Sequence, residues 1–356
     1  MNLRIGAWSL VALGMTVNAA CINFRPPARA VPEEARGAVP VELWQTPSGR
    51  GITDPAAVAG GRIWIGGADR YVRAFSLDTA RQLWSRRLPG AIVGGLVLRD
   101  SILYAATARP EGRIVAMSPG TGLQLWRSSP GDVVSGLGLS DDLIGVMNRR
   151  GELAVFHAGT GRFRWRRGIG LSRVAPAGIA GAFVVATEDS ILRVETTAGR
   201  VTHRRAAPGA VLHRWREVAG TLVAPTGDSL ILAIRPSTLA TAWQVKLDAP
   251  VTSDLAIAGD TVWAVTRAGA IYRILGGDGG RAELLTRVSA PVTSGIARVG
   301  DQLVVGGADG VLRGFASDGR EAWRTTLSWN ITVTAIPVAD GFVAIGGDGD
   351  VHRFRQ

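Results

Sequence analysis

The chain has 356 residues, of which 46% are hydrophobic, so it is long and apolar enough to bury a sizeable core. Its net charge of +11 comes almost wholly from arginine, because Lys246 is the only lysine, and such a bias alone says little about ligands. The single cysteine, Cys21, excludes an intrachain disulfide.

The first twenty residues have the pattern of an export signal. Arg4 supplies one positive charge, and an apolar stretch of 13 residues runs from Ile5 to Val17. Such a stretch is too short to cross a bilayer and has the usual length of a signal-peptide core. We therefore predict a signal peptide over residues 1–20 and an exported protein.

Cys21 stands directly after that segment, in a context that resembles a bacterial lipoprotein signal. In such signals the cysteine is lipidated and becomes the first residue of the mature protein. Asn18 departs from the pattern, because leucine is usual there. Ordinary cleavage after Ala19 or Ala20 is the alternative and would leave an unmodified thiol. We predict lipidation of Cys21, because the only cysteine falls at the one position that the signal requires.

Residues 21–40 combine the lipidated cysteine with a segment rich in proline, alanine and arginine. Proline-rich segments extend by about 3.1 Å per residue, so this one reaches up to roughly 60 Å. We predict a tether that holds a folded domain of residues 41–356 away from a membrane surface. The alternative is a disordered remnant without a mechanical role.

Tryptophan recurs at intervals of about 40 residues along the rest of the chain. The steps are 40, 42, 39, 78 and 80 residues, and the two long steps each hold one degenerate copy, with His203 and Leu284 in the missing slots. A fixed period of this length indicates a solenoid, a propeller or an array. The tryptophans of the series are Trp44, Trp84, Trp126, Trp165, Trp243 and Trp323.

Each repeat predicts four short strands. In the unit from Asp54 to Leu88, the segments 55–59, 62–65, 71–75 and 82–85 are apolar or alternating, and glycine or aspartate turns separate them. Four strands repeated eight times predict an all-β, eight-bladed β-propeller of four-stranded blades. A linear β-solenoid is less consistent, because its repeats are shorter.

The two ends of the chain complete the eighth blade. Three strands are expected within residues 331–355, and residues 41–46 form a lone strand before the first full unit. We predict that the N-terminal strand closes the ring as the outer strand of the last blade, so that no sheet edge stays unpaired in a monomeric propeller.

No catalytic, cofactor-binding or metal-ligating residues are predicted. The four histidines, including His157 and His352, are not spaced as metal ligands with one another or with acidic residues, and no Gly-x-Ser-x-Gly elbow is present. The glycine-rich run at 276–280 and the Asp-Gly-Asp at 348–350 are predicted to be turns.

Arginines gather just after the tryptophan slots, near one face or the rim of the ring. They would favour acidic proteins or anionic lipid head groups, or they are simply solvated. Nucleic acid is excluded as a partner, because the protein is exported and no series of aromatic residues accompanies the arginines. The positions are Arg86, Arg87, Arg127, Arg166, Arg167, Arg204, Arg205, Arg287 and Arg324.

The segments Ala116–Trp126 and Ala154–Trp165 resemble the PQQ-type propeller repeat, Ala-x-Asp-x-x-Thr-Gly-x-x-x-Trp, and the resemblance extends over residues 41–356. In that superfamily the Thr-Gly turn and the tryptophan lock neighbouring blades together. The resemblance therefore implies a blade-locking role for all six tryptophans of the series and reports the fold more than an activity.

Two branches of the superfamily compete. Quinoprotein dehydrogenases bind PQQ and calcium, but this chain has neither their cysteine pair nor an evident calcium-ligand set. The propeller lipoprotein of the outer-membrane β-barrel assembly machinery (BAM complex) is similar in length, blade number, lipidation signal and linker. That resemblance implies a non-enzymatic docking scaffold without a cofactor, anchored to the outer membrane and facing the periplasm. A generic exported propeller that binds another envelope protein or ligand stays an alternative, and a PQQ-dependent dehydrogenase is a remote one.

The loop 168–176 holds the candidate docking residues, Leu171 and Arg173. In the assembly-machinery subunit a similar inter-blade loop uses a leucine and an arginine to contact the partner's periplasmic domain. The next loop departs from the family, because Leu212, His213 and Arg214 stand where aspartates are usual. The alternative for Leu171 is that it caps the core between two blades.

Overall fold

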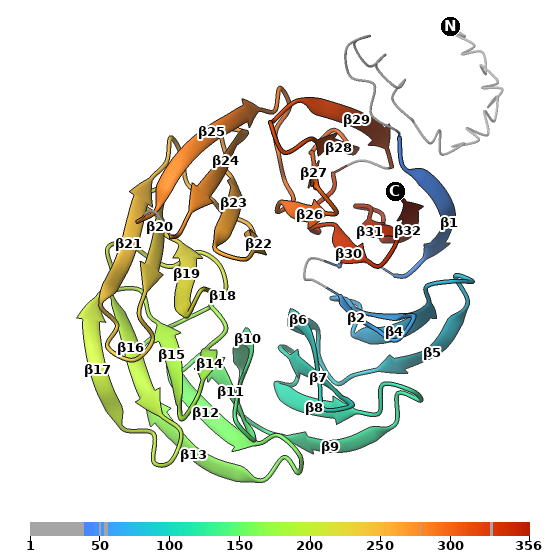
Figure 1. Ribbon diagram of the computed structural model, residues 1–356. Coiled ribbons are helices and arrows are strands. Elements are labelled where there is room, and N and C mark those ends of the chain that lie inside the picture. Colours follow the sequence, from blue (N-terminus) through green and yellow to red (C-terminus); the bar gives the residue numbers. More distant parts are fainter. Residues whose placement is uncertain (1–38, 50, 53–55, 278, 328–329) are drawn as a thin grey trace, which may run out of the picture.

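The computed structural model describes residues 39–49, 51–52, 56–277, 279–327 and 330–356. The described residues form eight antiparallel four-stranded sheets arranged as blades around a central channel (Figure 1), which confirms the predicted all-β, eight-bladed propeller. The predicted signal peptide, Cys21 and the predicted tether up to residue 38 lie outside the described residues.

Each blade runs from an inner strand at the channel to an outer strand at the rim. The first four blades are β2 (Ala57–Ala59), β3 (Arg62–Gly66), β4 (Tyr71–Ser76), β5 (Gln82–Arg87); β6 (Ile92–Arg99), β7 (Ile102–Thr107), β8 (Arg113–Met117), β9 (Gln124–Ser128); β10 (Val133–Ser140), β11 (Leu143–Asn148), β12 (Glu152–His157), β13 (Phe163–Gly168); β14 (Ala177–Ile179), β15 (Ala182–Ala186), β16 (Ser190–Glu195), β17 (Val201–Ala206). The other four are β18 (Arg216–Val218), β19 (Thr221–Pro225), β20 (Leu230–Ile234), β21 (Thr241–Lys246); β22 (Ala256–Ala258), β23 (Thr261–Val265), β24 (Ala270–Leu275), β25 (Arg281–Arg287); β26 (Ala297–Val299), β27 (Gln302–Gly306), β28 (Val311–Phe315), β29 (Glu321–Thr326); β30 (Ile336–Val338), β31 (Gly341–Ile345), β32 (Asp350–Arg355), β1 (Val41–Pro47).

The eighth blade joins the two ends of the chain, as the sequence predicts. β1 pairs antiparallel with β32, from Val41 opposite Arg355 to Pro47 opposite Asp350. Side chains reinforce this closure, because His352 Nδ1 lies 2.7 Å from Glu42 Oε1. The edge of β32 is therefore covered by a strand more than 300 residues away in sequence.

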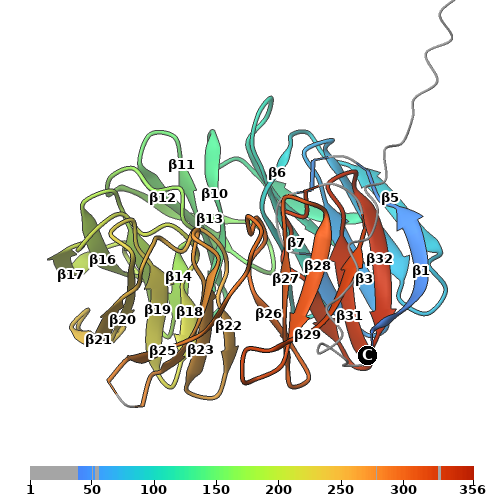
Figure 2. The same ribbon diagram turned by 90° about the horizontal axis from the view of Figure 1, so that it is seen from above.

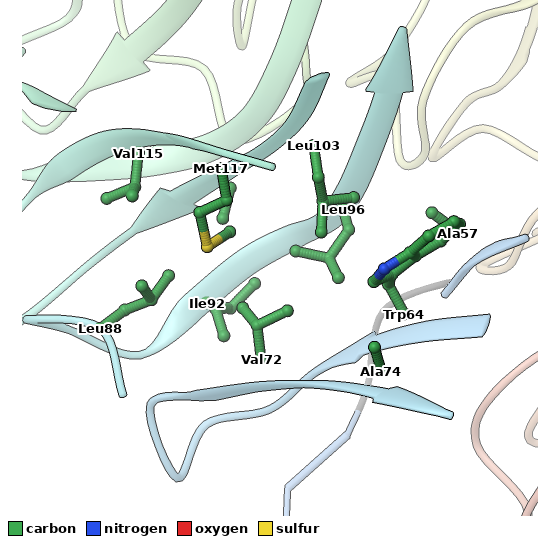
Figure 3. Close-up of a cluster of buried hydrophobic side chains, with 11 residues drawn as sticks. Ala57, Trp64, Val72, Ala74, Leu88, Ile92, Leu96, Leu103, Val115 and Met117 are labelled. Atoms are coloured by element: carbon green, nitrogen blue, oxygen red, sulfur yellow. The ribbon is translucent and has the colours of Figure 1, made fainter. Parts of the chain in front are cut away.

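The hydrophobic core is divided into eight clusters, one between each pair of neighbouring blades. Figure 3 shows the cluster between the first two blades, where Val72 of β4 faces Ile92 of β6 and Met117 of β8. Side chains from both neighbouring blades fill each gap, so no blade buries its faces alone. Edge-on, the ring is a flattened body whose strands run between its two faces (Figure 2).

The tryptophan slots lie where one blade meets the next. The indole Nε1–H groups of Trp44, Trp84 and Trp126 donate to the carbonyl oxygens of Leu77, Pro119 and Ala158 in the following blade, at 2.8, 3.0 and 3.0 Å. Trp165 donates to Thr196 O at 2.7 Å in the same way. Each bond anchors the outer strand of one blade to the turn before the outer strand of the next.

A glycine in that turn lets the indole approach. Gly161 has φ +69°, and a Cβ built on it would lie 2.4 Å from Cε3 of Trp126. Gly122 and Gly199 have the same relation to Trp84 and Trp165. The Thr-Gly pair thus serves two needs, a left-handed turn and a close contact that only glycine permits.

Two slots differ from the tryptophan pattern. His203 is exposed, and Leu239, with φ 60°, occupies the position where other blades have glycine. Leu284, the expected occupant of the seventh slot, is 45% exposed, whereas Leu285 packs against the core cluster shared with the next blade and touches Gly319. The assignment of the slot to Leu284 is therefore wrong. The bulge of this blade falls at 285, two residues later than in most blades, and reverses which side chain faces the neighbour.

Both predicted turns are present. The described residues of the run 276–280 connect β24 to β25, and Gly279 and Gly280 have positive φ. The Asp348–Asp350 segment connects β31 to β32, and Asp348 Oδ1 accepts a hydrogen bond from Asp350 N at 3.1 Å. These polar residues have local roles in chain reversal.

Candidate docking surface and channel mouth

All loops that join an outer strand to the next inner strand open onto one face of the ring. The reason is topological, because four antiparallel strands return the chain to the face from which it entered the blade. This face, called here the loop face, carries the loops 168–176, 207–215, 247–255 and 288–296 and the described residues of 327–335. The expected docking residues and the charged cluster described below therefore share one side of the protein.

The loop 168–176 presents both candidate docking residues to solvent. Leu171 is 53% exposed and Arg173 is exposed, whereas Ile169 is buried and its N–H donates to Gly151 O at 2.9 Å. The buried anchor of the loop is thus Ile169, and Leu171 does not cap the core between blades. The structure leaves the apolar side chain of Leu171 available for contact with another molecule.

The next loop of this face holds an ion-pair cluster. Arg214 donates from Nε at 2.9 Å and also from Nη2 to Asp254 Oδ2, and Asp254 Oδ1 accepts from Leu255 N at 3.0 Å. Two further basic side chains approach the same carboxylate, His213 at 3.7 Å and Arg216 at 3.8 Å. The basic residues that replace the family's aspartates therefore surround an aspartate supplied by the following blade.

Asp254 is only 7% exposed and stays ionised because of its neighbours. Burial by itself raises the pKa of its carboxyl group, but the positive charges of Arg214, Arg216 and His213 and the hydrogen bond from Arg214 lower the pKa by more, so the net direction is downward. One negative charge is thus held among several positive ones at the inner edge of the ring.

Beside this cluster a cavity of about 260 Å³ opens at the channel. It is lined by residues of the inner strands and loops of the fifth to eighth blades and by Ala56 of the first. Its charged lining residues are Arg214, Arg216, Asp254 and Arg298, and Thr334 adds a hydroxyl group. We call these five residues the channel mouth.

The sequence carries a signal for the channel mouth outside the tryptophan slots. The phrase Ala-Pro-Val-Thr-Ser recurs at 249–253 and 290–294 and is followed by Asp254 in one copy and Gly295 in the other. Counting back two residues from each inner strand places Arg214, Asp254, Gly295 and Thr334 at one repeat position. These four positions differ in chemistry, so they are not fixed by a contact that recurs in each blade.

Some of the arginines after the tryptophan slots have partners within the ring. Arg86 Nε donates to Gly122 O at 3.1 Å, and Arg205 Nη1 donates to Leu239 O at 2.9 Å, so both connect one blade to the next. Arg287 pairs with Asp248 at 2.6 Å. These three side chains are engaged in contacts between neighbouring repeats.

Apolar side chains are also exposed at the rim of the second and third blades. Leu125 of β9 is 53% exposed and Phe163 of β13 is 57% exposed, and a shallow hollow between the strands includes Arg127 and Arg166. Leu125 and Phe163 belong to outer strands, whereas Leu171 belongs to a loop of the loop face.

Within the described ranges, no group of three or more histidine, cysteine, aspartate or glutamate side chains is arranged to hold a metal ion. The same part of the chain contains no helix long and apolar enough to cross a membrane.

Comparison with known proteins identifies similar chains at the level of sequence and fold. A family model described as outer membrane protein assembly factor BamB matches residues 110–238 and 218–340. The outer membrane protein assembly factor BamB of Burkholderia pseudomallei (strain K96243) is 29% identical over 175 residues, which cover 46% of this chain and 45% of that relative. The match thus spans less than half the length of the relative.

Solved structures share the propeller. BamB from Moraxella catarrhalis has a TM-score of 0.74 at 17% identity and covers 90% of this chain and 98% of its own. The computationally designed Ika8 protein has a TM-score of 0.74 at 16% identity, with 87% of this chain and 98% of its own covered. The C-terminal WD40 domain of Sif2 has a TM-score of 0.73 at 12% identity, with 89% and 98% covered. At such identities the likeness shows the fold alone.

Proposed function

The chain belongs to the family of outer membrane protein assembly factor BamB, and from this premise we propose that it is a non-enzymatic docking scaffold of the cell envelope. Its proposed task is the assembly of outer-membrane β-barrel proteins. The observation that carries the proposal is the family match over residues 110–340 of a complete propeller ring. A propeller of this kind offers a rigid face on which loops hold a partner.

The proposed docking point is the exposed pair Leu171 and Arg173. An exposed leucine can fill a pocket on a partner, and the planar guanidinium of a nearby arginine can make paired hydrogen bonds, a combination found at interface hot spots. The 53% exposure of Leu171 and the anchoring of the loop through Ile169 support this assignment. The proposed partner is an outer-membrane barrel protein with periplasmic domains.

A crosslinked pull-down from cell envelopes tests the proposal. Leu171→Glu combined with Arg173→Glu should abolish partner capture and leave the melting temperature nearly unchanged, because both side chains are exposed. Leu125→Glu with Arg127→Glu is a matched control, since it changes the same residue pair at the same spacing on the rim and should still capture the partner.

The identity of the captured protein separates the two scaffold functions. Recovery of an outer-membrane barrel with periplasmic repeat domains supports a role in barrel assembly. Recovery of a different envelope protein would replace it with the generic scaffold function. Normal capture by the 171/173 variant would remove this loop from the interface.

The proposed anchor is a lipid on Cys21, joined to the propeller by the tether of residues 21–40. Cys21→Ala should release the protein from the outer membrane into the periplasm. Mass spectrometry of the mature N-terminus of the parent protein tests the lipidation itself. An unmodified terminus at Ala20 or Cys21 would contradict it.

A thermal-shift measurement tests the proposal that the protein binds no PQQ cofactor. PQQ and calcium added to the purified protein should not change its melting temperature, because a ligand that binds only the folded state must raise it. A concentration-dependent increase would instead support a quinoprotein dehydrogenase.

A further inference from the structure

We propose that the channel mouth is a binding site for a carboxylate or phosphate group, held by Arg216 and Arg298 beside the Arg214–Asp254 pair. The site is distinct from the docking pair in the loop 168–176. It can be measured on the isolated protein without a partner, so it goes beyond the proposed scaffold function.

The first argument is the balance of charge. Among the described residues, fourteen line the cavity, and the charged ones of these are three arginines and one aspartate. Arginine is always protonated near neutral pH, and the lowered pKa of Asp254 keeps its carboxylate ionised. The lining therefore carries two positive charges in excess.

The second argument is that the carboxylate of Asp254 is already hydrogen-bonded to Arg214 and to the backbone. Its Oδ2 accepts two hydrogen bonds from Arg214, and its Oδ1 accepts one from Leu255 N. Arg216 Nη1 is 3.8 Å from Oδ2, which is an electrostatic contact and longer than a hydrogen bond. Asp254 thus satisfies Arg214 and leaves the donors of Arg216 for another acceptor.

Arg298 has donors to spare for the same reason. Its guanidinium lies over the ring of Trp263, 5.5 Å from the centroid, a contact made through the face of the ring. Among the described residues, Trp263 is the one interaction partner of the Arg298 side chain. The N–H groups of Arg298 are not used in this ring contact. Two guanidinium groups therefore line one cavity with donors available for an anion.

The walls of the cavity strengthen the effect of these charges. Leu255, Ile257 and Ile296 line it together with other apolar side chains, and a concave apolar wall raises the local potential that an anion experiences. Thr334 contributes a hydroxyl group whose oxygen accepts from Gly295 N at 3.1 Å, so its hydrogen is free to be donated. The arrangement provides two forked cations and a neutral donor, which suits an oxyanion.

Calorimetric titration of the purified full-length protein tests the site with three probes at fixed ionic strength: inorganic phosphate, citrate and a hexaglutamate peptide. At least one probe should bind saturably to one site. Arg216→Gln with Arg298→Gln should weaken that binding roughly ten- to a hundredfold, because each variant removes charge-assisted hydrogen bonds.

The control removes the same charge elsewhere. Arg162→Gln with Arg164→Gln alters two exposed arginines near the outer strand β13, and it should leave the affinity within about twofold. Circular dichroism melts of both variants establish that each is folded. If hexaglutamate binds at least tenfold more tightly than citrate or phosphate, the carboxylate that the site recognises comes from an acidic protein segment. If citrate or phosphate binds at least tenfold more tightly than hexaglutamate, the ligand is a small free anion. Failure of all three probes to bind, or equal weakening by the control, would overturn the proposal.

Discussion

The outer belt and the channel mouth use the same repeat in opposite ways. In the outer belt, formed by the six tryptophans of the series and the turns that they cover, equivalent positions carry the same residue, and four of the six donate to a turn carbonyl of the next blade, as Trp84 and Trp126 do to Pro119 and Ala158. Trp323 differs, because its Nε1–H donates to Gln302 Oε1 of its own blade. At the channel mouth, equivalent positions carry an arginine, an aspartate, a glycine and a threonine in successive blades.

The difference separates what maintains the ring from what the ring is used for. A contact that must form at every blade junction constrains each repeat alike, so its residues recur. The channel-mouth positions make contacts that differ from blade to blade, such as the ion pair of Arg214 with Asp254 and the close approach of Gly295 to Thr334, so their residues need not recur. Departures from the repeat on the loop face therefore mark candidate sites, whereas departures in the belt, such as His203, mark weaker junctions.

Removal of the closing strand should have the largest effect. Deletion of residues 41–46 removes the pairing with β32 and the bond from Trp44 to Leu77 O, so it should lower the free energy of unfolding by about 5 kcal/mol or more and cause aggregation through the exposed edge. Thermal melts and light scattering measure both effects. Leu43→Ser, a change at a 42% exposed side chain, should shift stability by only about 0.5 kcal/mol. A deletion variant with an unchanged melting temperature would disprove the need for closure.

At the channel mouth, Asp254→Asn should cost about 3–5 kcal/mol of unfolding free energy, because it leaves the cations around a buried position without their counter-charge. Asp100→Asn, which alters an exposed ion pair with Arg99, should cost less than about 1 kcal/mol. Denaturant titration compares the two variants. Equal losses would mean that the cluster contributes no more to stability than a surface pair.

Two glycine variants with similar backbone angles separate the steric effect of the indole contact in the outer belt from the effect of backbone strain. Gly161→Ala should cost about 2–4 kcal/mol, because φ is +69° and the new Cβ would overlap the ring of Trp126. Gly181→Ala has φ +68° but nothing within 4 Å of the new Cβ, so only the backbone strain of about 1–2 kcal/mol remains. The difference between the two values measures the steric requirement of the tryptophan slot, and its absence would show that the indole can move aside.

The smallest predicted effect is on the pH dependence of stability. The pKa of Asp254 is lower in the folded protein than the usual value of about 3.9, so the unfolded chain binds more protons as pH falls. The stability that Asp254 contributes is present above pH 4 and is lost as pH decreases through the folded-state pKa. The parent should therefore lose more stability than Asp254→Asn between pH 5 and pH 3. Parallel pH profiles for the two proteins would contradict the ion-pair account.

The propeller itself could be predicted because its evidence is local and repeated. The tryptophan period, the Asp-Gly turns and the incomplete units at the two ends specified blade number and closure without any tertiary information. The prediction failed at Leu284, where sequence spacing alone could not reveal that the bulge of β25 falls at 285. A bulge changes which face a side chain occupies without changing the residue count that the repeat analysis measures.

The sequence by itself thus determined the fold, the ring closure and the family, and it singled out Leu171 and Arg173 as residues of an inter-blade loop. Only the tertiary structure decided that Leu171 is exposed and that Arg216, Asp254 and Arg298 line one cavity. The physical reason is that the strand pattern and the blade contacts repeat along the sequence, whereas the channel-mouth charges do not. Arg216, Asp254 and Arg298 come from three consecutive blades, and they line one cavity because the inner strands of those blades converge toward a common axis.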